Sequence, residues 1–468
     1  MADGEPPADR YLTPAEIAAW PGADCAHKDR HAPLRENLKR HGVWDDRQLA
    51  GRSWPIGCVA LEVTQRCNLD CTLCYLSEHA EVVRDIPIDE VFRRIDMIHR
   101  HYGRRTDVQV TGGDPTLRRR DELVAIVRRI RDRGMRPALF TNGIKASRDL
   151  LEELAAAGLV DVAFHVDMTQ QRAGYASEVA LNAVRRDYID LARGLDVRIL
   201  FNTTVFDGNF SEIPALTRFF TAHADAVHLA SFQLQADTGR GVLRQRDAVI
   251  SQQSVIAGIS EGVGFPVDFD APMVGHPRCN KYTALLEAGG RLYPLFDDNA
   301  FFADLFRRSA GHRFDRHDWK HSLAAAARVA IGNPTLCAKV IRFVARKAWQ
   351  MRAGLARSGG RVNKISIFVH NFMDAERLER DRCESCVFMV ASADGPISMC
   401  VHNAKRDAVV LRPLTMATAT GKKYWDPLTG RTRETPPTQP AAEPAAQPLK
   451  RLKGRARKAA LSDRAKDG

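Results

Sequence analysis

Three cysteines stand close together in the stretch RCNLDCTLCYL. Cys67, Cys71 and Cys74 are separated by three and then two residues. A structural zinc site or a complete iron–sulfur site normally takes four protein ligands. Three thiolates at this spacing therefore predict a metal centre with one position left open, where another ligand can bind and react.

A second group of cysteines occurs much later, in HPRC, CESC and SMC. Its members are Cys279, Cys383, Cys386 and Cys400. Two cysteines separated by two residues, together with distant partners, are a recurrent arrangement for enclosing a metal. The group predicts a second metal centre, and zinc is an alternative to iron because four thiolates complete a tetrahedral site.

The positive charge of the chain is concentrated in two segments. The formal net charge of the 468 residues is +12. Residues 431–468 hold ten Lys/Arg and four Asp/Glu, and residues 338–364 hold eight Lys/Arg and no acid. The remainder is close to neutral, which disfavours a broad nucleic-acid-binding face.

The sequence predicts a cytoplasmic protein. Its first residues lack a signal pattern, and no apolar run approaches the roughly 20 residues that span a bilayer. In a reducing compartment, cysteines are more often metal ligands or catalysts than disulfides. The ten cysteines of the chain are ample for metal centres, whereas Cys58 and Cys337 are interpreted as buried small residues.

Short β-branched runs alternate with amphipathic helical patterns from Cys58 onward. Six such units predict an α/β fold with a parallel sheet, in the form of a partial (β/α)6 TIM-like barrel. The expected regions are an N-terminal extension (1–54), the barrel (55–264), an auxiliary region with a basic amphipathic helix (265–425) and a disordered basic Pro/Ala-rich tail (426–468).

Polar residues and glycines gather where the predicted strands end. In parallel β/α folds, the C-terminal ends of strands feed the loops of the active site. The candidates are Gly112, Gly113 and Asp114 in TGGDPT, Asn142 in TNG, Asp167, Asn202, Thr203, and Arg240 in ADTGR. Ordinary turns, a helix N-cap or loop hydrogen bonds are alternatives for several of them. His165, within an apolar strand, is interpreted as a core histidine.

This constellation resembles the radical S-adenosylmethionine (radical SAM) enzymes, in which a CxxxCxxC loop follows the first strand of a partial barrel. The resemblance implies that Cys67, Cys71 and Cys74 hold a 4Fe-4S cluster and that the fourth iron binds S-adenosylmethionine. Electron transfer to the sulfonium then releases a 5′-deoxyadenosyl radical, which abstracts hydrogen from a substrate. The protein supplies position and excludes water.

The same resemblance assigns roles to the other strand-end residues. Gly112, Gly113 and Asp114 match the family's GGE-type loop near the methionyl amino group, with Asp in place of Glu. Arg240 is expected to pair with the methionyl carboxylate. Contacts to the adenosine or ribose are expected from Asn142, Asp167 and Thr203. Leu73 departs from the aromatic residue that commonly precedes the third cysteine.

A narrower resemblance involves SFQLQADTGR, GHPRCNKYT, HNFMDAERLERDRCESC and GPISMCVHN. These segments resemble class D methyltransferases and archaeal tetraether lipid synthases, over roughly residues 55–425. The resemblance implies an auxiliary 4Fe-4S cluster on Cys279, Cys383, Cys386 and Cys400. It also implies methylation or C–C bond formation at an unactivated C–H bond of a small molecule or lipid, with an external low-potential electron donor.

Two other functional classes fit the cysteines. One is a non-enzymatic iron–sulfur electron carrier and the other is a zinc-bound scaffold. A carrier needs no pocket for S-adenosylmethionine, so the polar strand ends favour the enzyme. A zinc scaffold would be colourless, whereas iron–sulfur clusters absorb visible light.

The stretch CAKVIRFVARKAWQMRAGLARSG predicts a basic amphipathic helix. Such a helix can lie on an anionic membrane, here with Lys339, Arg342, Arg346 and Lys347 at the lipid and Trp349 at the interface. The protein would then be peripheral at the inner face of the membrane. The alternative is a helix packed on the barrel with a solvated basic face.

Overall fold

The structure is a computed structural model that describes residues 11–435, except 25, 244–245, 247–248, 313, 316–318 and 419–420. Most of the predicted disordered tail, residues 436–468, therefore lies outside the described residues.

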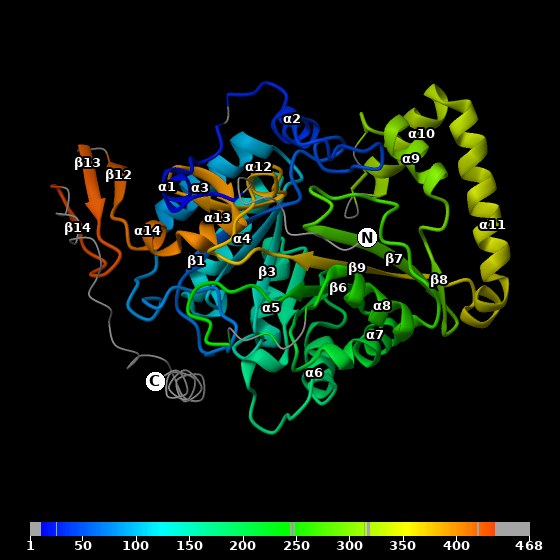
Figure 1. The fold of residues 1–468 in the computed structure, drawn as a ribbon, viewed down its shortest axis with the longest axis horizontal. Coiled ribbons are helices and arrows are strands. Elements are labelled where there is room, and N and C mark those ends of the chain that lie inside the picture. Colours follow the sequence, from blue (N-terminus) through cyan, green and yellow to red (C-terminus); the bar gives the residue numbers. More distant parts are fainter. Residues whose placement is uncertain are drawn as a thin grey trace.

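Six parallel strands in chain order form the centre of the molecule (Figure 1). They are β1 (Cys58–Thr64), β2 (Asp107–Gly112), β3 (Arg136–Thr141), β4 (Asp161–His165), β5 (Arg198–Val205) and β6 (Val227–Leu234). The helices that follow them are α3 (Ile88–Tyr102), α4 (Arg120–Asp132), α5 (Arg148–Ala157), α6 (Asn182–Ala192), α7 (Ile213–Ala222) and α8 (Gln252–Val263). The predicted β/α alternation is confirmed, and the fold is α/β with the large, mostly parallel sheet of a partial barrel.

The helices cover one face of this sheet because each has apolar residues at helical spacing. On α3, Val91, Ile95 and Ile98 are fully buried. They join a core that also contains alternate residues of the strands, such as Val59 and Leu61 of β1. The other residues of each strand point the opposite way, toward the inside of the barrel.

The C-terminal region extends the same sheet at both ends. Strand β10 (Phe388–Ser392) pairs in parallel with β1, and β9 (Asn363–Asn371) pairs in parallel with β6. Antiparallel strands complete the edges, namely β7 (Asn280–Ala288), β8 (Arg291–Pro294) and β11 (Gly395–Ser398). The region beyond residue 264 therefore shares its sheet with the barrel.

The N-terminal extension packs against this C-terminal region. It contains α1 (Pro14–Ala19) and α2 (Ala32–Arg40). The amide of Leu12 donates to the carbonyl of Leu378 at 2.8 Å, and the side chain of Asn37 donates to the carbonyl of Glu384 at 2.7 Å. The acceptor Glu384 ends the short helix α12 (Arg380–Glu384).

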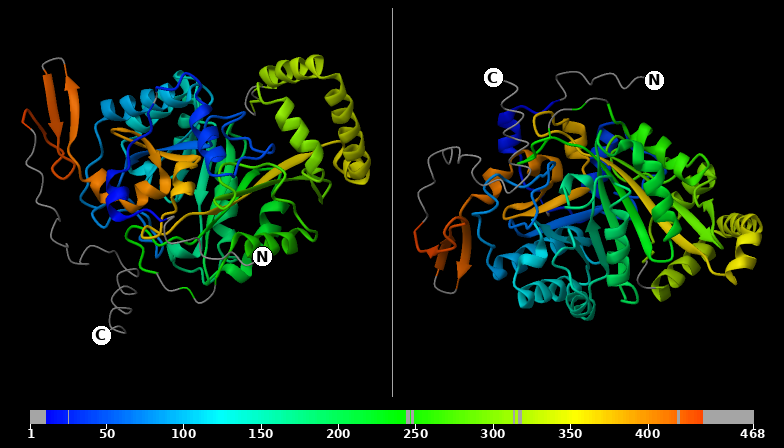
Figure 2. Two further views of the ribbon diagram at one scale, coloured as in Figure 1. Left: turned by 45° about the horizontal axis from the view of Figure 1, so that its top comes forward. Right: turned by 90° about the horizontal axis from the view of Figure 1, so that it is seen from below.

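The predicted basic helix is confirmed as α11 (Pro334–Ser358). Together with α9 (Asn299–Arg308) and α10 (Trp319–Gly332), it forms a helical group at one end of the molecule, as both views in Figure 2 show. Among the described helices, none combines the length and apolar character that crossing a bilayer requires.

At the opposite end lies a small antiparallel sheet of β12 (Leu414–Thr418), β13 (Gly421–Trp425) and β14 (Thr432–Arg433), reached through α13 (Met399–Ala404) and α14 (Arg406–Val410). The expectation that disorder begins at residue 426 is wrong for residues 426–435. A tight turn returns the chain there, because the Asp426 carboxylate accepts from the amide of Leu428 at 2.9 Å and Gly430 adopts a positive φ of 70°.

Candidate active site and metal centres

The loop with Cys67, Cys71 and Cys74 follows β1 at the C-terminal edge of the parallel strands. Loops from other strand ends hold it through backbone hydrogen bonds. The amide of Thr72 donates to the carbonyl of Thr169, after β4, at 2.9 Å. After β6, the amide of Val242 donates to the carbonyl of Thr72 at 2.8 Å. The cysteine loop is thus part of the barrel edge.

Burial governs the ionisation of these thiols. It raises the pKa of Cys67 to about 11 and that of Cys71 well above its ordinary value, and the neighbouring Cys74 adds to both shifts. Uncompensated thiolates are therefore disfavoured at this place. A bound cationic metal centre would stabilise them, because thiolates are the ligands it requires. The donor set thus fits the 4Fe-4S cluster that the family implies.

The two glycines of TGGDPT allow one loop to approach another closely. A Cβ atom on Gly112 would lie 2.0 Å from the carbonyl oxygen of Thr64, and one on Gly113 would lie 2.0 Å from that of Arg66. Gly112 also has a φ of 130°, which favours glycine. The close approach seen here is between the β2 loop and the start of the cysteine loop.

Asp114 is held inside the fold by its own hydrogen bonds, and its contact with a methionyl amino group stays a prediction. Its side chain is fully buried. The carboxylate accepts from the amide of Thr116 at 3.0 Å, the hydroxyl of Thr141 at 2.9 Å and the amide of Asn142 at 2.9 Å. Asp114 therefore connects the loops that follow β2 and β3.

Asn142 extends this connection to the cysteine loop. Its side-chain nitrogen donates to Oδ1 of Asn68 at 2.6 Å and lies 3.8 Å from Sγ of Cys67. The structure thus brings Asn142 beside the thiols. A contact between Asn142 and the adenosine stays a prediction.

Arg240 lies under the cysteine loop with a side chain that is only 4% exposed. It contacts Glu81 at 3.3 Å and donates to the carbonyl of Leu69 at 3.2 Å. Burial alone would lower the pKa of Arg240, but the proximity of Cys74 outweighs it and raises that pKa. Arg240 therefore provides positive charge beside the thiols, and its pairing with a ligand carboxylate stays a prediction.

Two of the expected ligand contacts point elsewhere. Asp167 is fully buried and accepts from the amides of Thr169 at 2.9 Å and Thr204 at 2.8 Å, so it caps a turn and joins two strand ends. Thr203 faces the helices, because it lies two positions after Phe201 and therefore on the same face of β5. Phe201 stacks on Phe220 of α7. Contacts of Asp167 and Thr203 with the adenosine or ribose stay predictions.

His165 is not the core histidine that its apolar strand suggests. It lies on the inner face of β4, where its side chain is 34% exposed, and its Nε2 is 2.6 Å from Oδ2 of Asp167. Burial alone would lower the pKa of His165, but Asp167 outweighs it and raises that pKa above its ordinary value. The signal in the sequence was the alternation in FHVD, which places His165 opposite to Phe164 and Val166.

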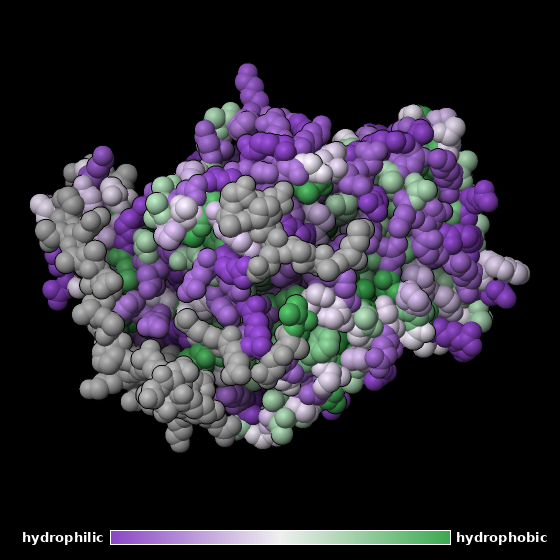
Figure 3. Space-filling model, viewed as in Figure 1, coloured by the Kyte–Doolittle hydropathy of each residue, from purple (hydrophilic) through white to green (hydrophobic). Residues whose placement is uncertain are grey.

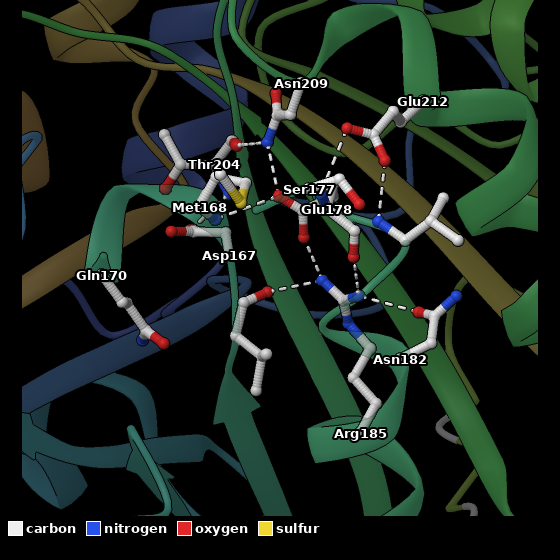
Figure 4. Close-up of polar contacts among 12 residues, drawn as sticks. Asp167, Met168, Gln170, Ser177, Glu178, Asn182, Arg185, Thr204, Asn209 and Glu212 are labelled. Carbon is white, nitrogen blue, oxygen red and sulfur yellow. Dashed lines mark hydrogen bonds and ion pairs between the residues drawn. The ribbon is translucent and has the colours of Figure 1, made fainter. Parts of the chain in front are cut away.

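A buried ionic network supports these strand ends from below (Figure 4). Arg185 of α6 forms an ion pair with Glu178 and donates to the carbonyl of Val166 at 2.8 Å. Glu178 in turn accepts from the amide of Met168 at 3.0 Å and from the side chain of Asn209 at 2.8 Å. The network fixes both sides of Asp167.

The inner wall of the barrel consists of layers, as the register of the strands shows. The lower layer is apolar and contains Phe140, Ala163, Leu200 and Leu229. The layer above it contains His165, Asn202, Ser231 and Phe368. Phe140, His165, Leu229 and Phe368 are only half-buried, so this wall retains space for a ligand. The hydroxyl of Ser231 is buried without a hydrogen-bond partner among the described residues.

The structure also brings the second group of cysteines together, from three separate segments. Cys279 precedes β7, Cys383 lies in α12, Cys386 precedes β10 and Cys400 lies in α13. Burial raises the pKa of Cys383 well above its ordinary value, and the adjacent Cys400, Cys386 and Cys279 add to the shift. All four thiols therefore lie within electrostatic reach of one another.

A cation favours ionisation in this second group. Nε of Arg382 donates to Sγ of Cys279 at 3.2 Å. Burial alone would raise the pKa of Cys279, but Arg382 and His276 outweigh it and lower that pKa. Between Cys383 and Cys386, the hydroxyl of Ser385 is fully buried and lacks a hydrogen-bond partner among the described residues. The donor set fits a metal–sulfur centre.

The spacing of possible ligands bears on which metal would fit. Within the described part of the chain, no three Cys, His, Asp or Glu side chains are close enough together to hold one metal ion. A zinc ion would need four sulfurs at about 2.3 Å. A four-iron cluster is wider than one ion and holds its thiolates further apart. A cavity of about 540 Å³ under the N-terminal extension reaches Cys383 and Cys386.

Residues 61–219 match the sequence family described as the Radical SAM superfamily. The 7,8-dihydro-6-hydroxymethylpterin dimethyltransferase of Methanocaldococcus jannaschii is 23% identical over 390 residues, which are 73% of this chain and 76% of that protein. A probable GTP 3′,8-cyclase of Pyrococcus abyssi is 32% identical, over 35% of this chain and 53% of that protein.

Other similar proteins match shorter parts. A PqqA peptide cyclase of Bradyrhizobium diazoefficiens is 30% identical, over 37% of this chain and 46% of that protein. The chain thus spans about half the length of each cyclase. The crystal structure of Streptococcus suis SuiB aligns with 49% of both chains at 14% identity and a TM-score of 0.35.

Proposed function

Because residues 61–219 form a radical SAM domain, we propose that this chain cleaves S-adenosylmethionine reductively and activates a C–H bond of a substrate. The observation that carries the proposal is the position of Cys67, Cys71 and Cys74. All three lie on one loop at the C-terminal edge of a parallel barrel, where β/α enzymes place their chemistry. An electron carrier has no use for the half-buried inner wall of the barrel that these strands form.

The three thiolates would hold the radical-generating cluster. When bound, a 4Fe-4S cluster offers an open iron to S-adenosylmethionine and an electron to its sulfonium, which releases a 5′-deoxyadenosyl radical. Arg240 supplies positive charge beside the thiolates. Asp114 and Asn142 hold the loops in position through the hydrogen bonds described above.

The inner wall of the barrel is the proposed site of the substrate. Its apolar layer, with half-buried Phe140 and Leu229, suits an apolar portion of a molecule, and His165 with Asn202 offers hydrogen bonds above it. This composition supports a substrate that has both an apolar portion and polar groups, either a lipid or a small molecule. The name of the M. jannaschii relative supports methylation, and C–C bond formation is the other outcome that we propose.

The second group of cysteines is proposed to hold an auxiliary 4Fe-4S cluster. The four thiols that come together from separate segments support a metal–sulfur centre, and the resemblance to enzymes with auxiliary clusters favours iron over zinc. An external low-potential donor would supply electrons to the protein.

The first experiment is anaerobic reconstitution with iron and sulfide, followed by dithionite and S-adenosylmethionine. Mass spectrometry should detect 5′-deoxyadenosine from the wild type and from the control Cys337→Ala, whose cysteine lies on α11 outside both groups. Cys67→Ala, Cys71→Ala and Cys74→Ala should each abolish the product. Undiminished 5′-deoxyadenosine from any of these three variants would refute the assignment.

A second experiment separates the two reactions. The reconstituted enzyme is incubated with lipid and pterin extracts, and the masses of new products are measured. A gain of one methyl group indicates methylation, whereas the summed mass of two chains less hydrogen indicates C–C coupling. Formation of 5′-deoxyadenosine without any new product would leave the radical site intact and contradict both substrate classes.

A further inference from the structure

The hairpin of α10 and α11 is a part of the molecule that the proposed chemistry does not use. Its two helices are joined at Asn333 and lie at the end of the molecule away from β12–β14 (Figure 1). On its inner side, Phe343 of α11 stacks on Phe301 of α9 with ring centroids 4.6 Å apart. Met351 is also buried on this side, so packing accounts for one face of α11.

The outer side of the hairpin carries exposed apolar side chains among its basic ones, and Figure 3 shows pale and green residues interspersed with purple ones at this end of the molecule. Five of the twelve exposed large hydrophobic side chains among the described residues lie on these two helices. They are Leu323 (62% exposed), Ile331 (84%), Ile341 (64%), Val344 (56%) and Trp349 (69%). Exposed alanines lie between them on α11, including Ala345 and Ala348. An exposed apolar group of this kind marks an interaction surface.

The charge of the hairpin has one sign. Residues 319–364 contain ten Lys/Arg and no Asp or Glu. Three of the four basic residues expected at a membrane have acidic partners outside the helix, since Lys339 pairs with Asp304 at 2.6 Å and both Arg346 and Lys347 pair with Asp297 at 2.8 Å and 2.6 Å. Two carboxylates offset only part of this charge, and contact of these three residues with a membrane stays a prediction.

Three other arginines accompany the exposed apolar residues. Arg328, Arg342 and Arg352 are exposed and form no ion pair with described residues. The guanidinium of Arg352 lies 4.3 Å from the ring centroid of Trp349. Tryptophan beside arginine suits the boundary between water and lipid, where one end of each side chain is apolar and the other is polar.

We propose that the outer side of the α10–α11 hairpin docks on an anionic lipid surface. Ile331, Ile341 and Trp349 enter the boundary of the acyl chains, and Arg328, Arg342 and Arg352 contact the negative headgroups. Charge complementarity selects this occupant, because the surface offers only positive charge and apolar side chains. The attachment lies on the membrane, since no described helix is able to cross it.

The hairpin residues are tested in the full chain by co-sedimentation with vesicles of phosphatidylcholine, alone or mixed with phosphatidylserine. The wild type should pellet with the mixed vesicles, less so at high salt, because screening weakens the attraction. Arg342→Glu/Arg352→Glu should weaken the partition at least about ten-fold, since each basic residue near the surface contributes several-fold. Ile341→Ser/Trp349→Ser should weaken it even at low salt.

Matched controls change residues of the same type at the far side of the barrel. Arg128→Glu replaces an exposed arginine of α4, and Val179→Ser replaces an apolar side chain that is 40% exposed. Both should bind vesicles as the wild type does. All variants should keep the wild-type melting temperature, which excludes misfolding as the cause of lost binding.

Two results would overturn the proposal. One is equal pelleting with neutral and mixed vesicles, or hairpin variants that pellet like the wild type. The other is a hairpin-dependent change in oligomeric state by sedimentation velocity without vesicle binding, which would make a second copy of the chain the occupant. No cofactor is needed in these assays, so their outcome is independent of the proposed radical chemistry.

Discussion

The two groups of cysteines differ in how the chain brings them together. Cys67, Cys71 and Cys74 lie on one short loop, so their proximity is a property of local sequence. The second group comes from three segments, and Cys279 and Cys383 are more than a hundred positions apart. Its geometry depends on the folding of the whole C-terminal region, including the contact with the N-terminal extension.

Their electrostatic settings differ as well. Arg240 lies beside the loop cysteines, yet burial still raises the pKa of Cys67 and Cys71. In the second group, Arg382 donates directly to Cys279 and contributes to a lowered pKa there. The loop cysteines can therefore be changed with little effect on the folding of the barrel. In the second group, Cys383 and Cys400 belong to a buried cluster, so changes there should affect the fold itself.

The largest expected effect concerns iron content. The reconstituted wild type should bind about eight irons, as two four-iron clusters. The triple variant Cys67→Ala/Cys71→Ala/Cys74→Ala should retain about half of them and unfold like the wild type, because the loop lies at the barrel edge. Iron analysis and thermal unfolding measure both quantities. Complete loss of iron in this variant, or stoichiometric zinc in place of the remaining iron, would contradict two independent clusters.

The sequence was sufficient for the features that rest on local patterns. The β/α alternation predicted the barrel, and the spacing of the first three cysteines predicted the loop. It was insufficient for the direction of single side chains. Asp114 looked like a ligand contact, but the hydroxyl of Thr141, distant in the sequence, binds its carboxylate. No local pattern reports such a partner.

Alternation in strands could have improved the prediction at other positions. Thr203 is predicted from the sequence to contact the ligand, but Phe201 and Val205 mark its side of β5 as the helix-facing side. Asn202 and Thr204 lie on the inner face. The same alternation places His165 on the inner face of β4, because its neighbours Phe164 and Val166 lie in the core. In α11, the sequence identifies the basic residues, but the acids Asp297 and Asp304 that pair with three of them lie outside the helix.

A second prediction compares the two cations. Arg382→Gln should reduce the free energy of unfolding by about 1–3 kcal/mol, because the carbonyl of Asn371 and one oxygen of the buried Glu379 carboxylate lose their donor. Arg278 still pairs with the other oxygen of Glu379. Arg240→Gln should cost less, since its partner Glu81 is 20% exposed and water can solvate it. Urea unfolding of the metal-free variants measures the difference. If Arg240→Gln lowered the free energy of unfolding as much as Arg382→Gln or more, the second group of cysteines would not be the more important of the two for the fold.

A third prediction tests the role of Asp114. Asp114→Ala should lower the free energy of unfolding by about 1–3 kcal/mol even without metal, because buried donors from Thr116, Thr141 and Asn142 lose their acceptor. Thr116→Val is the matched control, since it removes one donor and leaves the others bound. A variant of normal stability that binds S-adenosylmethionine more weakly would restore direct ligand contact.

The smallest expected effect is the pH dependence of the ion pair between His165 and Asp167. The folded-state pKa of His165 is raised above its ordinary value of about 6.5, so the stabilisation is fully present below that pH. It is lost as the pH rises through the raised value. Glu178 supports the shift and Arg172 opposes it. Because the histidine is one-third exposed, solvent screening limits the contribution to less than about 1 kcal/mol.

His165→Gln should therefore destabilise the protein more at about pH 6 than at about pH 9, because the stabilisation by the ion pair is lost as the pH rises through the raised pKa. Urea unfolding of the metal-free protein at both pH values measures this. The control His223→Gln changes a half-buried histidine at the end of α7, where Nδ1 contacts the carbonyl of Phe219. A loss of stability that is equal at both pH values would show that His165 acts by packing and not through its charge.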